Sequence, residues 1–228
     1  MPITTCIFDA YGTRFDVSAA ARLAAEEPGR DKLAACWQKL ASDWRNKQLQ
    51  YTWLRAVTGD HADFWDVTQN GLDWAMEANG LADLELRERL LALYWELRAY
   101  KEVPLMLAQL KKAGMNTAIL SNGSPDMLDG AVSSAGIATT LDDVLSVEDV
   151  GVFKPHASVY DLVGKRFNCQ KDEVLFVSSN GWDAGCATGY GFTTAWVNRA
   201  GEPVDRLPWT PAHILTDLTT IPELAGAL

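Results

Sequence analysis

Residues 4–12 read Thr4-Thr5-Cys6-Ile7-Phe8-Asp9-Ala10-Tyr11-Gly12, an apolar run that stops at an acidic residue and a turn. A short run of apolar residues without polar alternation is typical of a strand that is buried on both faces. Gly12 supplies the turn signal directly after it. The stretch therefore predicts a central strand with the Asp9 carboxylate at its carboxyl end.

The chain beyond Val103 alternates between helical and strand patterns. Helices are expected at 104–113, 125–135 and 156–167, and strands at 116–120, 144–145, 174–177 and 193–197. Repeated strand–helix units predict a parallel sheet with helices on both faces. The fold class is therefore α/β, with a Rossmann-like core.

The intervening segment shows only helical periodicity. From Asp31 to Tyr100, large apolar residues recur at three- and four-residue steps, with Gly80 and Pro104 as breaks. This pattern predicts an all-helical insertion after the first strand. We expect residues 1–15 and 101–228 to form the core domain and residues 16–100 to form a helical cap domain.

Composition narrows the classes of partner. The 228 residues carry 20 Lys and Arg against 30 Asp and Glu, for a net charge of −10, which disfavours nucleic acid as a partner. The sequence contains no apolar stretch of about 18 residues, so we expect no membrane span, and we recognise no signal peptide. The four cysteines lack metal-ligand spacing, so we expect reduced thiols and a cytoplasmic location.

Four polar clusters fall where predicted strands end: Asp9, Ser121-Asn122, Lys154, and the segment from Ser178 to Asp183. Each cluster alone is typical of a turn, a helix cap or a solvated lysine. Ligands of open parallel sheets bind at the carboxyl ends of the strands, where these clusters should meet. Together they predict one functional site.

These clusters resemble the four motifs of the haloacid dehalogenase superfamily in order and spacing. The matching segments are 8–13, 121–123, 154–155 and 178–183, and the cap segment 44–55 resembles the L-2-haloacid dehalogenases more narrowly. The similarity runs from about Ile7 to Arg199. It implies a metal-free hydrolase without a cofactor, which converts short L-2-haloacids and water to 2-hydroxy acids and halide.

Two departures from the superfamily's phosphatases favour this narrower identification. A phosphatase carries a second Asp two residues after its nucleophile as a general acid, but here Tyr11 stands at that position. Phosphatases also need acidic Mg²⁺ ligands in the last motif, where this chain has Ser178, Ser179 and Asn180. A halide leaves without protonation, so direct displacement at carbon needs no general acid at the position of Tyr11. A metal-free site likewise needs no acidic Mg²⁺ ligands in the last motif.

The resemblance assigns roles to individual residues. Asp9 would be the nucleophile, Arg45 the halide-binding residue of the cap, and Asp183 the residue that positions or activates water. The other expected catalytic residues are Thr13, Ser121, Lys154, Tyr160, Ser178 and Asn180. The expected substrate- and halide-binding residues, besides Arg45 and Ser121, are Tyr11, Asn46, Leu49, Phe64, Asn122 and Trp182.

Several alternatives stay open at this level. Arg45 and Lys154 suit solvated surface charges, Tyr160 suits core packing, and Asp183 suits a helix cap. Arg14 stands where the family usually has Leu, which implies a changed contact between cap and core or a wider specificity. His156 replaces a usual acidic residue without a functional explanation.

Other functions and assemblies are also compatible with the sequence. A Mg²⁺-dependent phosphatase and a non-catalytic binding protein share this fold class. The resemblance further implies a homodimer formed through the cap.

Overall fold

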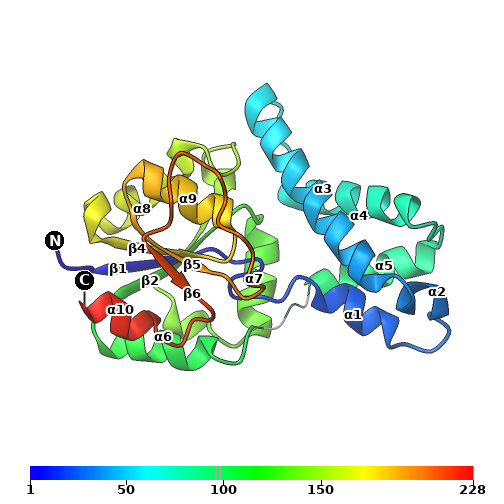
Figure 1. Ribbon diagram of the computed structural model, residues 1–228, viewed down its shortest axis with the longest axis horizontal. Helices are drawn as coiled ribbons and strands as arrows, with labels where there is room; N and C mark the ends of the chain where they lie inside the picture. The colour runs from blue at the N-terminus through cyan, green and yellow to red at the C-terminus, as the bar shows by residue number, and fades with distance from the viewer. Residues whose placement is uncertain (96, 98, 228) are drawn as a thin grey trace.

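The structure is a computed structural model that describes residues 1–95, 97 and 99–227. Figure 1 shows two lobes, a sheet-containing core that holds both termini and a helical lobe beside it. The sheet has six strands in the order β3-β2-β1-β4-β5-β6, and every pairing is parallel. The α/β core with an inserted helical cap is therefore confirmed.

The strand predicted from residues 4–12 lies at the centre of this sheet. β1 (Thr5–Phe8) is fully buried and pairs with β2 (Asn116–Ser121) and β4 (Val174–Ser178). The remaining strands are β3 (Asp143–Ser146), β5 (Thr193–Val197) and β6 (His213–Leu215). The sequence analysis missed β6, because this three-residue edge strand is only half-buried and lacks an apolar run.

Helices cover both faces of the sheet. In Figure 1, α8 (Ala157–Phe167) and α9 (Gly181–Tyr190) lie above the sheet, and α6 (Val103–Lys112) and α10 (Ile221–Ala227) lie below it. α7 is Pro125–Ser134, and short 3₁₀ turns occupy η1 (Ala138–Thr140), η2 (Val147–Asp149) and η3 (Lys171–Glu173). This layering buries β1 and directs the strand ends toward the second lobe.

The cap contains the helices between β1 and α6. They are α1 (Ala19–Ala25), α2 (Asp31–Ala34), α3 (Trp37–Thr58), α4 (Phe64–Ala78) and α5 (Leu84–Trp95). The prediction missed α1, whose alanine-rich sequence lacks the large apolar residues that reveal a helical face. The exact domain division at residues 15/16 and 100/101 stays a prediction.

The antiparallel pair α3 and α4 approaches closely because of a glycine. A Cβ added at Gly71 would lie 3.2 Å from the backbone nitrogen of Gln48 and 3.4 Å from the Trp44 ring. The Trp44 indole N–H also donates to the Thr68 carbonyl at 2.8 Å across the same contact. Gly71 therefore permits backbone contact between the two helices, which compensates for its low helix propensity.

Of the two departures noted in the sequence, only His156 has a local explanation. Arg14 is fully buried with its guanidinium 5.0 Å from the centre of the Phe8 ring, and burial lowers its pKa to about 9. None of its three guanidinium nitrogens has a hydrogen-bond partner among the described residues, and the structure gives no explanation for an arginine at this position. His156 is the N-cap of α8, where its Nδ1 accepts the Ser158 backbone N–H.

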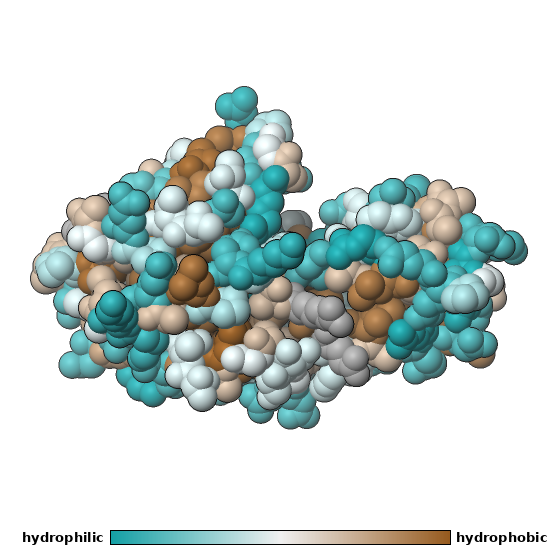
Figure 2. Space-filling view, turned by 90° about the horizontal axis from the view of Figure 1, so that it is seen from below, coloured by the Kyte–Doolittle hydropathy of each residue, from teal (hydrophilic) through white to brown (hydrophobic). Residues whose placement is uncertain are grey.

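The surface in Figure 2 is mostly hydrophilic, with hydrophobic residues in separate patches on both lobes. Within the described part of the chain, no helix combines the length and apolar character that crossing a bilayer requires.

We predict that Gly71→Val lowers the free energy of unfolding by about 1–3 kcal/mol, because a β-branched side chain separates α3 from α4. The matched control is Gly164→Ala in α8, where the added Cβ meets only the Cys169 carbonyl at 3.5 Å. This control should raise stability by about 0.5–1 kcal/mol through helix propensity. Denaturant unfolding measures both changes, and equal responses of the two variants would contradict the close-approach role of Gly71.

Candidate active site

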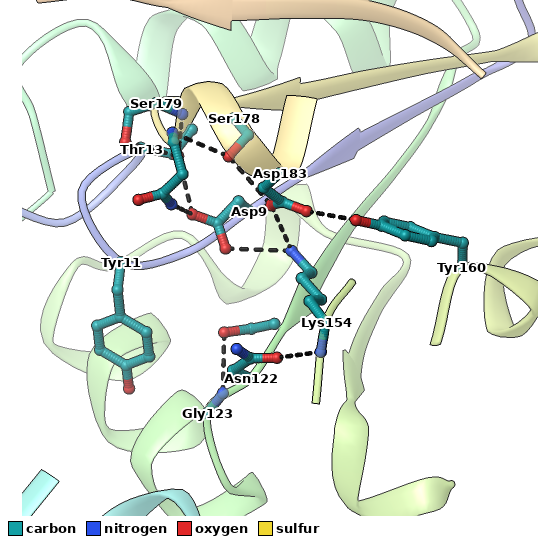
Figure 3. Close-up of polar contacts among 12 residues, drawn as sticks. Asp9, Tyr11, Thr13, Asn122, Gly123, Lys154, Tyr160, Ser178, Ser179 and Asp183 are labelled. Atoms are coloured by element: carbon teal, nitrogen blue, oxygen red, sulfur yellow. Dashed lines mark hydrogen bonds and ion pairs between the residues drawn. The ribbon is translucent and has the colours of Figure 1, made fainter. Parts of the chain in front are cut away.

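The carboxyl ends of three adjacent strands bring the predicted motifs together. Asp9 follows β1, Ser121 ends β2, and Ser178 ends β4. Because β2, β1 and β4 are neighbours in the sheet, these residues share one edge. The loop before α8 adds Lys154 to the same place, as Figure 3 shows.

The Asp9 carboxylate is held on both oxygens. Its Oδ2 accepts hydrogen bonds from Thr13 Oγ1 and Asn180 Nδ2, each at 3.0 Å, while its Oδ1 lies 3.2 Å from Lys154 Nζ. The Asp9 backbone N–H donates to the Val177 carbonyl at 2.9 Å. Oδ1 therefore has fewer donors than Oδ2 and is the oxygen with lone pairs free to react.

Lys154 is buried between two carboxylates. Its Nζ lies 3.2 Å from Asp9 Oδ1 and 2.9 Å from Asp183 Oδ2, and its side chain is 1% exposed. Burial favours the neutral amine, but attraction by Asp183 and Asp9 outweighs it, so the pKa of Lys154 is raised. The surface-charge alternative for Lys154 is wrong, because this ammonium neutralises the interior of the site.

Asp183 is fully buried and saturated with donors. Tyr160 Oη donates to its Oδ1 at 2.7 Å, and Ser178 Oγ donates to its Oδ2 at 3.1 Å. Burial raises the pKa of Asp183, and the nearby Lys154 opposes that shift. Tyr160 is thus part of the polar network as well as of the aromatic core around Phe176.

This donor set does not fit a divalent metal ion. Mg²⁺ would need the oxygens of Asp9 and Asp183, but the ammonium of Lys154 already bridges them. Among residues 1–95, 97 and 99–227, no three His, Cys, Asp or Glu side chains are grouped to hold a metal.

The cap places Arg45 over the core site. Its Nη2 donates to Asn180 Oδ1 at 3.0 Å and to the Tyr11 carbonyl at 3.3 Å, and its Nη1 donates to Gln48 Oε1 at 3.1 Å. Arg45 is therefore an interdomain contact, not a solvated charge on a helix surface.

A small cavity lies between Arg45 and Asp9. Its volume is about 10 Å³, and it is lined by Asp9, Tyr11, Arg45, Leu49, Phe64, Ser121, Asn122, Lys154, Asn180 and Trp182. This is roughly the space that one water needs, so an organic ligand enters only if the cap moves away from the core.

The remaining predicted residues lie outside this lining. Thr13, Tyr160, Ser178 and Asp183 stand behind Asp9 and Lys154 in the polar network. Asn46 is not brought to the cavity: it is exposed, and its amide donates to Ser42 at 3.4 Å. On α3, Arg45 and Leu49 share a face, whereas Asn46 lies about 100° around the helix from Arg45.

Sequence analysis missed residues that support the site from behind. Gln48 contacts Arg45, and Thr68 and Tyr94 contact Gln48. Ser179 donates its backbone N–H to Thr13 Oγ1 at 2.7 Å. Gln48 lies one helical turn after Arg45, a spacing that could have suggested the contact, but Thr68 and Tyr94 come from other helices.

Comparisons with known proteins agree with this geometry. Residues 3–189 match the sequence model of the protein family described as haloacid dehalogenase-like hydrolases. The chain is 41% identical to (S)-2-haloacid dehalogenase 1 of Pseudomonas sp. strain CBS-3, covering 98% of this chain and 96% of that protein. It is 40% identical to the (S)-2-haloacid dehalogenase of Pseudomonas sp. strain YL, covering 95% and 92%.

Solved structures give the same result. A crystal structure described as a dehalogenase superposes with a TM-score of 0.93 at 37% identity, covering 98% of this chain and 97% of that one. The L-2-haloacid dehalogenase of Xanthobacter autotrophicus with covalently bound chloropropionic acid has a TM-score of 0.85 at 35% identity, covering 97% and 98%. The chain therefore belongs to the haloacid dehalogenase-like hydrolases and, within them, to the family of (S)-2-haloacid dehalogenases.

Proposed function

We propose that the protein hydrolyses short L-2-haloalkanoic acids to 2-hydroxy acids with inversion, through an ester on Asp9. The observation that carries this proposal is the arrangement around Asp9. Its Oδ1 is paired with the buried Lys154, and the residue two positions later is the buried Tyr11. Burial raises the pKa of Tyr11 far above its usual range, so Tyr11 is a poor proton donor to a basic leaving group.

In the first step, Asp9 Oδ1 attacks C2 of the haloacid from the side opposite the halogen. The new C–O bond forms as the carbon–halogen bond breaks, and the bonding pair leaves with the halide. Thr13 and Asn180 hold the other carboxylate oxygen and fix the direction of attack. Alignment of this kind contributes up to about 7–11 kcal/mol to a displacement.

The departing halide meets donors at the roof of the cavity. Arg45 supplies a guanidinium, and the Trp182 indole N–H is buried without a partner among the described residues. Both groups line the cavity together with the Phe64 ring, so a weakly hydrated anion finds donors and aromatic edges there.

The floor of the cavity offers donors to the substrate carboxylate. Ser121 Oγ accepts the Gly123 N–H at 3.0 Å, so its own hydroxyl hydrogen is free to donate. Asn122 Oδ1 accepts the Lys154 backbone N–H at 2.9 Å, which leaves its NH₂ group free. Ser121 and Asn122 therefore both present hydrogen-bond donors to an anionic ligand.

In the second step, water attacks the ester carbonyl carbon of Asp9. The bond between this carbon and Oδ1, which is now bonded to C2, breaks; Oδ1 leaves as the hydroxyl oxygen of the 2-hydroxy acid, one proton is released, and the oxygen from water restores the carboxylate. Lys154 loses one of its two charged partners when Asp9 is esterified, so its ammonium stabilises the negative charge that develops in hydrolysis. Asp183 lies behind Lys154 and holds this ammonium beside Asp9 during hydrolysis.

We also propose a homodimer formed through the cap. Trp53, Leu54 and Val57 on α3 and Trp74 on α4 are large apolar side chains that remain exposed, Val57 at 86%. Trp53, Leu54 and Trp74 line one groove, and grouped apolar side chains of this kind mark interaction surfaces. A second copy of the chain is the occupant to which we assign this surface.

The expected cytoplasmic location stays a prediction. Its support is that all four cysteines, Cys6, Cys36, Cys169 and Cys186, are free thiols.

The proposed activity predicts chloride release from L-2-chloropropionate and chloroacetate that EDTA does not reduce. Asp9→Asn should lower the release rate by about 10³-fold or more while the fold is retained, because the nucleophile is removed. Asp172→Asn, an exposed acidic residue in η3, serves as the matched control and should match the wild type. Mg²⁺-dependent hydrolysis of p-nitrophenyl phosphate without halide release would contradict the proposal in favour of a phosphatase.

The dimer proposal predicts twice the chain mass in solution by light scattering. Leu54→Glu combined with Val57→Glu should shift the protein to a monomer, because two charges would be buried at the interface. Leu105→Glu places one such charge on an exposed leucine of α6 in the core and should leave the dimer intact. A wild-type monomer, or a dimer in the double variant, would refute this interface.

A further inference from the structure

We propose that Thr68 and Gln48 are positioning residues that fix the guanidinium of Arg45 through a chain of hydrogen bonds in which the direction of donation is determined at each step. The inference rests on the proposed function, in which Arg45 binds the departing halide. Neither Thr68 nor Gln48 lines the cavity, and both are buried, Thr68 at 0% and Gln48 at 1% exposure. Their effect on the reaction therefore passes through Arg45.

The chain begins at the backbone of α4. Thr68 Oγ1 donates its hydrogen to the Phe64 carbonyl at 2.7 Å. Because a hydroxyl has only one hydrogen, Thr68 Oγ1 can only accept from Gln48, which lies 2.7 Å away. The Gln48 atom that faces Thr68 is therefore the amide nitrogen Nε2.

This contact determines which way the Gln48 amide points. Nε2 also lies 3.1 Å from the Tyr94 hydroxyl, so its two hydrogens have partners in the cap interior. The carbonyl oxygen Oε1 is then directed to Arg45 Nη1 at 3.1 Å. A flipped amide would place its NH₂ group against the guanidinium, so that two donors faced each other without an acceptor.

The chain lies entirely within the cap. The other side-chain acceptor of Arg45, Asn180 Oδ1, belongs to the core and is 3.0 Å away in the closed cap. When the cap moves to admit substrate, the contact with Asn180 breaks, but Gln48 stays beside Arg45 on α3. The chain from Phe64 through Thr68 and Gln48 thus keeps the guanidinium oriented before the site closes again.

The experiment compares single-turnover halide release from L-2-chloropropionate and L-2-iodopropionate. Chloride is the poorer leaving group, so its departure depends more strongly on Arg45. Thr68→Val should slow chloride release by about tenfold or more, and iodide release by a smaller factor, because Gln48 loses the acceptor that sets its orientation. Arg45→Ala should also slow chloride release more than iodide release, and both rates should fall further than in Thr68→Val.

Two variants provide matched controls. Thr68→Ser keeps the hydroxyl and should restore both rates to within about twofold of the wild type. Thr52→Val removes another buried helical hydroxyl, which donates only to the Leu49 carbonyl at 2.7 Å, and should leave both rates unchanged. If Thr68→Val does not fold, Gln48→Leu removes the acceptor for Arg45 directly and should show the same halide dependence.

The positioning role would be overturned if Thr68→Val slowed chloride and iodide release by the same factor. It would also be overturned if Thr68→Val slowed release no more than Thr52→Val does. Failure of the underlying function gives a different result. The wild type would then release neither halide, or Arg45→Ala would release chloride as fast as the wild type, and the assignment of Arg45 would fall together with the chain that supports it.

Discussion

The ammonium of Lys154, buried between the carboxylates of Asp9 and Asp183, is the interaction on which the site depends. Two carboxylates this close could not both stay ionised in the interior without a positive charge between them. Lys154 balances the charge of Asp9 and fixes the orientation of its carboxylate, and it remains as a positive charge when Asp9 is consumed by a covalent bond. The same ammonium pairs with both carboxylates at once and so balances their charge within the site.

The two lobes divide the reaction between them. The core supplies the nucleophile from the end of β1 and its charge balance from Lys154 in the loop before α8, while the cap supplies Arg45, Leu49 and Phe64. Closure leaves a cavity of about 10 Å³, which keeps bulk water away from the reacting carboxylate. The contacts between cap and core include Arg45 to Asn180, the edge-on rings of Trp53 and Trp182, and the pair formed by His61 and Glu148.

Sequence patterns predicted the core well, because buried parallel strands are continuous apolar runs and their polar ends converge on one edge. They did not reveal the burial of Lys154, which depends on the tertiary placement of a loop before α8. They also placed Asn46 with Arg45, although neighbouring residues on a helix face different directions. Thr68 and Tyr94 carry no local signal, since their contact with Gln48 arises only when α3, α4 and α5 pack together.

The central claim is that Asp9 bonds transiently to the carbon that bears the halogen. A single turnover in H₂¹⁸O, with enzyme in excess, tests it most directly by mass spectrometry of the peptide that contains Asp9 and of the product. The account predicts one ¹⁸O in the Asp9 carboxylate and an unlabelled hydroxyl in the 2-hydroxy acid, because water attacks the ester carbonyl. Label in the product hydroxyl with Asp9 unlabelled would mean that water attacks C2 itself and would contradict the account.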